Sequence, residues 1–166
     1  MRIILIFLMF KMSLFGSSLK VGGNAPDFIL NDQDGKQRQL SDYKGKKLVI
    51  YFFPKAFTPG WTKQACGLRD NYSDFTLKNI SILGVSYDFE SKLSEFKEKY
   101  SLEFNLLSDS KKTMGELYDV NSFYFFPQRK TFLIDQNGVL VHIIDSVKIN
   151  THADDILAIF KKLKGV

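Results

Sequence analysis

The sequence predicts an α/β fold in which a central mixed sheet carries helices on both faces. Segments rich in strand formers alternate with amphipathic helical segments, and residues 47–53 form a run that is apolar after Lys47, as in a strand covered on both sides. Asn137-Gly138 is the strongest short signal for an antiparallel hairpin. The 166 residues, 45% of them hydrophobic, match one domain that folds without disulfides or a structural metal.

The elements are predicted in order from local patterns. A turn signal at 31–35 separates apolar 28–30 from polar 36–41, which indicates an N-terminal β-hairpin. The strand at 47–53 follows, and then a helix over 62–78 with apolar residues three and four apart. The remaining predictions are strand 80–85, helix 91–100, strand 104–107, helix 112–118, strands 130–135 and 139–144, and helix 154–163.

Residues 1–18 are set apart as a signal or N-terminal extension, and residues 19–166 form the predicted domain. The apolar run 3–10 follows one positive residue, as in a secretory signal, although Lys11 interrupts it early. A bilayer-spanning helix takes about 20 residues, so no integral membrane span is expected. Export, an uncleaved membrane-surface anchor and a true start at Met12 stay open, and the location is accordingly cytoplasmic or exported.

The charge and the rare residue types exclude several function classes. The formal charge of +5 comes from basic residues spread along the chain, which argues against a nucleic-acid partner. One cysteine excludes an internal disulfide and multi-cysteine metal sites. His142, expected on a strand, and His152, expected to precede or cap the last helix, are too far apart to argue for a metal site. We therefore expect no metal and no cofactor, and neither histidine as a general base.

The most specific pattern lies at 51–70, which reads YFFPKAFTPGWTKQACGLRD. With this segment, the chain resembles the peroxiredoxin family, in its bacterioferritin-comigratory or peroxiredoxin Q branch, over nearly everything after residue 18. The resemblance implies a thioredoxin-like fold and thiol-based reduction of hydroperoxides, with electrons from a thioredoxin-like reductant. Further matching segments are 25–28, 84–88, 106–109, 129–135 and His152 before the last helix.

The resemblance also implies roles for individual residues. Family members place a cysteine thiolate in the first turn of the helix after 58–60, where free N–H groups and the helix dipole stabilise it. The thiolate becomes a sulfenic acid, which a second cysteine converts to a disulfide. The Thr58 hydroxyl would bind peroxide or thiolate, Arg129 would lower the thiolate pKa, and Pro54 would shield the pocket. Structural alternatives stay open, because Thr58 also suits a helix cap, Arg129 a surface ion pair and Pro54 the end of a strand.

The residue at the family's peroxidatic position is Trp61. An indole has no ionisable thiol, cannot attack a peroxide and is much larger than a cysteine side chain. Peroxidase activity is therefore expected to be impaired or absent. Ala56 and Phe57 stand where the branch often carries polar residues, and Gln64 where it usually carries Glu. These changes indicate a packed apolar patch or an altered binding pocket.

The single cysteine, Cys66, stands at the resolving position of the branch, five residues after Trp61. Helical positions five apart lie about 8.5 Å from each other, beyond disulfide reach, so the family's disulfide needs the helix to unwind. Here Cys66 has no partner in the chain. It is expected to be a small buried side chain, and the alternative is a one-cysteine redox site that forms mixed disulfides with a partner.

Three functional hypotheses stay open, and a monomer or weak dimer is expected throughout. The chain is a peroxiredoxin with thiol peroxidase activity retained or rescued by Cys66, or a non-enzymatic binding or redox-partner protein on the same fold. In the third hypothesis, position 61 is a misread cysteine or selenocysteine in an active peroxidase.

Overall fold

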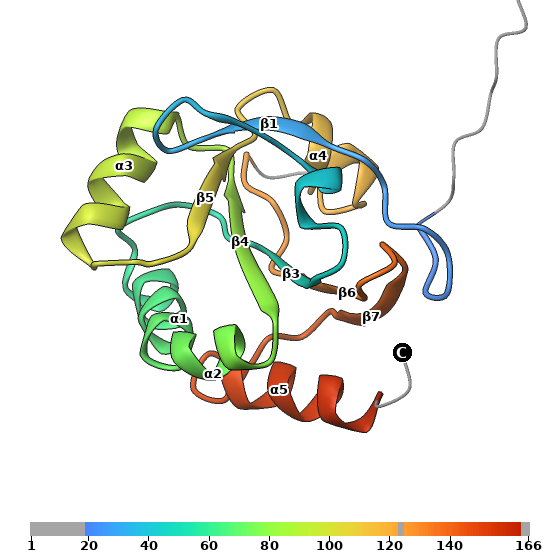
Figure 1. Cartoon of the computed structure of the whole chain (residues 1–166). Helices are drawn as coiled ribbons and strands as arrows, with labels where there is room; N and C mark the ends of the chain where they lie inside the picture. The colour runs from blue at the N-terminus through green and yellow to red at the C-terminus, as the bar shows by residue number, and fades with distance from the viewer. Residues whose placement is uncertain (1–18, 123–124, 164–166) are drawn as a thin grey trace, which may run out of the picture.

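The computed structural model describes residues 19–122 and 125–163, and the predicted signal or extension 1–18 lies outside them. Within the described residues, a seven-stranded sheet has the order β2-β1-β5-β4-β3-β6-β7 (Figure 1). The strands are β1 Ile29–Asp32, β2 Gln37–Gln39, β3 Lys47–Phe52, β4 Ile80–Ser86, β5 Asn105–Ser108, β6 Thr131–Ile134 and β7 Leu140–Ile144. The helices are α1 Pro59–Asp70, α2 Tyr72–Leu77, α3 Glu90–Lys99, α4 Thr113–Leu117 and α5 His152–Lys162, with a 3-10 turn, η1, at Leu40–Tyr43.

The sheet is mixed, as predicted. Strand β4 pairs in parallel with both β3 and β5, whereas the pairs β1–β2, β1–β5, β3–β6 and β6–β7 are antiparallel. Both predicted hairpins are present, β1–β2 near the N-terminus and β6–β7 around Asn137-Gly138. Gly138 has φ +82°, a left-handed conformation that a glycine adopts at little cost.

Alternating side chains of β3 face two different cores. Val49 and Tyr51 pack against one core cluster, which draws its helical residues from α1, α2, α3 and α5. Leu48 and Ile50 belong to the second cluster, which includes Met114 of α4 and the segment before β1. All four of these β3 side chains are buried, as a strand covered on both faces requires. The prediction of helices on both faces is confirmed.

The predicted helix over 62–78 is wrong in its extent. It begins earlier, at Pro59, because a proline at the first helical position lacks only an N–H that would be unpaired there. It is also broken at Asn71, which separates α1 from α2. The side-chain amide of Asn71 donates a hydrogen bond to the carbonyl oxygen of Gly67 at 2.9 Å, which stabilises the end of α1.

Candidate functional site

The loop between β3 and α1 is anchored by a carboxylate that lies at the end of the neighbouring strand, β4. The backbone N–H of Ala56 donates to Oδ2 of Asp88 at 2.7 Å. The same carboxylate accepts hydrogen bonds from Ser86 Oγ at 3.1 Å and from Lys92 Nζ at 2.8 Å. Because the side chain of Asp88 is 12% exposed, these bonds form largely out of water and hold the loop against the sheet.

The same loop is apolar where the sequence suggested an apolar patch. Ala56 is buried, and the Phe57 ring packs edge-on against buried Phe96 at a centroid distance of 5.2 Å. The ammonium of Lys99 lies 5.5 Å from the centre of the Phe57 ring. Phe57 has φ +67°, a left-handed backbone conformation that is unfavourable for a bulky residue. The packing of its ring is therefore achieved at a cost in backbone free energy.

Thr58 precedes α1 at its N-cap position, and its carbonyl accepts the first helical hydrogen bond, from Thr62 N at 3.0 Å. Its hydroxyl makes no cap bond to the helix and donates instead to the carbonyl of Lys55 at 3.1 Å. Pro54 is half-buried and lies just beyond the end of β3. Pro54 therefore agrees with its structural alternative at the end of a strand, whereas the Thr58 side chain does not cap the helix. The roles of both residues toward peroxide stay predictions.

Trp61 and Arg129 are brought into direct contact. Trp61 lies in the first turn of α1, half-buried against the core, and the guanidinium carbon of Arg129 lies 3.6 Å from the centre of its ring. This distance is a close cation–π contact. Burial lowers the pKa of Arg129, and none of the acids in the described residues forms an ion pair with it. The surface ion pair considered for Arg129 is therefore absent from the described residues. The guanidinium of Arg129 lies instead against the indole of Trp61.

Cys66 lies in the middle of α1 and is partly exposed, so the expectation of a buried side chain is wrong. Its neighbour Ala65 is buried, because that position faces the sheet directly. The hydroxyl of Tyr51 is buried without a hydrogen-bond partner in the described part of the chain. Burial raises the pKa of Tyr51, and the nearby Cys66 acts in the same direction.

A buried polar cluster behind α1 was missed by the sequence analysis. His152, expected to precede or cap α5, is its first residue and is 2% exposed. Its Nδ1 lies 3.1 Å from Nε2 of Gln64, and its Nε2 lies 2.9 Å from Oγ1 of Thr131. An amide nitrogen only donates, so Nδ1 accepts and the ring proton on Nε2 is donated to the threonine hydroxyl. The cluster thus joins α1, β6 and α5.

The electrostatics of this cluster favour a neutral imidazole. Burial lowers the pKa of His152 to about 4, with Asp155 opposing this change and Arg129 adding to it. Oε1 of Gln64 is buried and has no partner in the residues described. One signal pointed to the cluster, since Gln64 lies three residues after Trp61 and four before Leu68, on the apolar face of α1.

The other functional groups considered from the sequence lie apart. His142 lies on a strand, β7, as expected, and is exposed. Between residues 19 and 163, with 123–124 excepted, no three metal-ligating side chains cluster together. Over the same residues, no helix has the length and apolar character needed to cross a bilayer.

A mixed sheet with helices on both faces, and a loop-to-helix site at the carboxyl end of a central strand, places the chain among thioredoxin-like α/β proteins. The AhpC/TSA family model matches residues 21–143. The chain belongs to this family, and the expected resemblance, fold and peroxiredoxin-family function are confirmed. The family implies a peroxide substrate and a thioredoxin-type reductant.

Individual relatives match over most of their length. The chain is 44% identical over 146 residues to the protein named Peroxiredoxin Bcp of Escherichia coli (strain K12), covering 84% of this chain and 94% of the relative. It is 39% identical over 153 residues to the Bacillus subtilis (strain 168) protein of the same name, covering 88% and 98%. The crystal structure of Peroxidoxin BcpB from Mycobacterium tuberculosis superposes with a TM-score of 0.82 at 34% identity, covering 88% and 99%.

Proposed function

We propose that this chain is a peroxiredoxin-family protein whose peroxide-reducing site is closed by Trp61. The family activity would be the reduction of hydrogen peroxide and organic hydroperoxides with electrons from a thioredoxin-like protein. The observation that carries the proposal is the contact of Arg129 with Trp61, at 3.6 Å from the guanidinium carbon to the ring centre. The cation that would stabilise a thiolate is engaged by a side chain that contains no sulfur.

The chemistry supports the same conclusion. Peroxide reduction by a thiol requires a sulfur anion that attacks the O–O bond, and the first turn of α1 favours such an anion through its free N–H groups. Trp61 lies in that turn, packs against the core and offers neither a nucleophile nor a group that can become sulfenic acid. The Thr58 hydroxyl is directed to the carbonyl of Lys55 in this arrangement.

Cys66 is the only thiol in the chain. It lies on α1 beyond the first turn, so it gains less from the dipole and free N–H groups of the helix start. After one oxidation it has no second cysteine in the chain to form a disulfide with. We propose that Cys66 does not sustain peroxide turnover.

The test is a coupled assay in which thioredoxin, its reductase and NADPH are present in excess and peroxide is varied. Wild-type protein should consume NADPH no faster than the mixture without it, with hydrogen peroxide or cumene hydroperoxide. The variant Trp61→Cys should gain activity if Thr58 and Arg129 are still correctly placed, and Trp61→Ser is its matched control without a thiol. Wild-type turnover that disappears in Cys66→Ser would overturn the proposal.

The identity of residue 61 is tested separately, by mass spectrometry of the peptide that contains it and by sequencing its codon in independent DNA. A tryptophan mass supports the closed site, whereas cysteine or selenocysteine would restore the family mechanism. We further propose a monomer or weak dimer in solution, which light scattering during size-exclusion chromatography would test. A stable higher oligomer would contradict that part of the proposal.

A further inference from the structure

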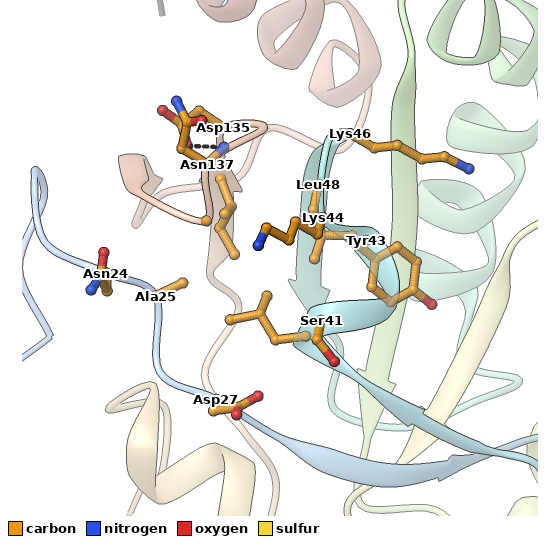
Figure 2. A pocket seen from close by; sticks show the side chains of 13 residues that line it. Asn24, Ala25, Asp27, Ser41, Tyr43, Lys44, Lys46, Leu48, Asp135 and Asn137 are labelled. Carbon is orange, nitrogen blue, oxygen red and sulfur yellow. Dashed lines mark hydrogen bonds between the residues drawn. The ribbon is translucent and has the colours of Figure 1, made fainter.

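A pocket of about 330 Å³ lies at the amino end of β3, at the other end of this strand from the loop that leads to Trp61 (Figure 2). Three segments distant in the sequence form it: residues 24–27, the turn region 40–46 and the β6–β7 turn at 134–138, together with Leu48. Its volume is at the lower end of the range of about 300 to 1,000 Å³ that is usual for small-molecule sites.

The floor of the pocket is apolar and is part of the second core cluster. Ala25, Leu48 and Ile134 line it and are 6%, 1% and 1% exposed, and half-buried Leu40 adds to the same surface. Because these side chains are fixed by the packing between β3, β6 and the segment before β1, the apolar surface exists before any ligand arrives. A preformed floor lowers the entropy cost of binding.

The rim of the pocket holds polar side chains without hydrogen-bond or ion-pair partners among the described residues. Asn24, Ser41, Lys44 and Asn137 line the pocket, and their side chains make no hydrogen bond or ion pair with the residues that the structure describes. Figure 2 shows the ammonium of Lys44 directed into the pocket, whereas Lys46 points away from it. A free cation and three free polar groups thus surround an apolar floor.

The two acids of the pocket accept hydrogen bonds from backbone N–H groups. Oδ1 of Asp27 accepts a hydrogen bond from the N–H of Phe28 at 2.9 Å. Oδ1 of Asp135 accepts from the N–H groups of Asn137 and Val139, both at 2.9 Å. Neither carboxylate forms an ion pair with Lys44 within the described chain. Lys44 is therefore directed into the pocket without an ion-pair partner among the described residues.

We propose that this pocket binds a small amphipathic carboxylate, a short aliphatic or single-ring acid, with its carboxylate on Lys44 and its apolar body against half-buried Leu40, above Leu48 and Ile134. The amides of Asn24 and Asn137 and the Ser41 hydroxyl supply further hydrogen bonds at the rim. Pro54 lies six positions after Leu48 along β3 and its continuation, about 20 Å of extended chain. Binding here does not depend on the state of residue 61.

The test uses the full chain and two probes of equal size, 4-phenylbutyrate and the neutral 4-phenylbutanamide. Each is titrated into isotope-labelled protein while the backbone amide signals of Ala25, Lys44 and Gly138 are followed by NMR. We expect saturable shifts at these amides and tighter binding of the acid. Lys44→Gln should weaken the binding of 4-phenylbutyrate roughly fivefold, as for the loss of one partly exposed ion pair. The same variant should leave the affinity for 4-phenylbutanamide unchanged.

Two further variants make the result specific. Lys46→Gln removes the same charge from a side chain that points away, so it should leave the affinity for the acid unchanged. Ser41→Phe, at an exposed position of the rim, should fill the pocket and abolish binding of both probes while the remaining spectrum shows an intact fold. Equal affinity for both probes, equal loss in both lysine variants, shifts centred on Trp61, or no saturable shift at all would overturn the proposal.

Discussion

Nε2 of Gln64 lies 3.1 Å from Nδ1 of His152, although 88 residues separate the two in the sequence. The contact connects the helix that carries Trp61 to the first residue of α5. Since the imidazole also meets Thr131 on β6, one neutral histidine ties together the three elements around the site. The protonation state of His152 therefore affects both stability and the positions of these elements.

The first prediction concerns pH. His152 has a pKa of about 4 when folded, against an ordinary value of 6.5, so the unfolded chain binds more protons between these values. The contribution of neutral His152 to the free energy of unfolding is complete above about pH 6.5 and is lost as the pH falls to about 4. The loss is about 1.4 kcal/mol for each pH unit and about 3 kcal/mol in total. Urea denaturation from pH 7 to pH 4 should show a steeper loss in wild type than in His152→Gln. His142→Gln, at an exposed site, serves as the control and should follow wild type; equal slopes in all three proteins would contradict the prediction.

The second prediction concerns the charge beside this histidine. Gln64→Glu places a carboxylate next to Nδ1, which favours the imidazolium and should raise the pKa of His152 well above 4. NMR titration of the ring protons measures this directly. Lys63→Glu changes charge at the adjacent exposed position and should move the pKa far less. An unchanged pKa in Gln64→Glu would show that the two side chains do not interact as described.

The third prediction concerns the contact between Trp61 and Arg129. A double-mutant cycle with Trp61→Leu and Arg129→Met should give a coupling free energy of about 0.5 to 2 kcal/mol, because a partly desolvated cation lies on the indole face. Equilibrium denaturation of the four proteins supplies the values. A parallel cycle on Phe57 and Lys99, whose separation is 5.5 Å, should give a smaller coupling. A coupling near zero at Trp61 and Arg129 would remove the basis for a closed site.

The fourth prediction concerns the carboxylate that anchors the β3–α1 loop. Asp88→Ala leaves the N–H of Ala56 and the ammonium of Lys92 without their partner and should lower the free energy of unfolding by about 1 to 3 kcal/mol. Asp70→Ala removes an exposed carboxylate paired with Arg69 and should cost less than about 1 kcal/mol. Similar losses in both variants would mean that the loop does not depend on Asp88.

The fifth prediction compares two glycines. A Cβ at Gly67, in α1, meets nothing within 4 Å, so Gly67→Ala should stabilise the protein by about 0.5 to 1 kcal/mol through helix propensity. A Cβ at Gly138 also meets nothing within 4 Å, but the backbone there has φ +82°, which an L side chain rarely adopts. Gly138→Ala should therefore destabilise the protein by about 1 kcal/mol or more. Denaturation midpoints give both signs, and a destabilising Gly67→Ala would show that α1 tolerates no added atom there.

Local patterns predicted the elements that depend on near neighbours. The hairpin at Asn137-Gly138 was predicted because a two-residue turn specifies its own geometry, and β3 because both of its faces are apolar. The break at Asn71 was missed, since apolar spacing continues through it to Phe75 and the ending hydrogen bond comes from one side chain.

The site was predicted only as far as the resemblance extends. The resemblance placed Trp61 and Arg129 in one site but did not indicate that the guanidinium lies on the indole face. The cluster of Gln64, Thr131 and His152 was missed because its members come from three separate elements, and no spacing in the sequence relates them. Such contacts follow from the packing of the elements on the sheet, which a local pattern does not contain.

Trp61 is the only tryptophan in the chain. The tryptophan fluorescence of the protein therefore comes entirely from the first turn of α1, where Arg129 contacts the indole. Cys66, the only thiol, lies partly exposed on the same helix and offers one site for a covalent label. The protein thus contains its own optical reporter and a unique attachment point beside it, so opening of α1 can be followed without introducing any substitution.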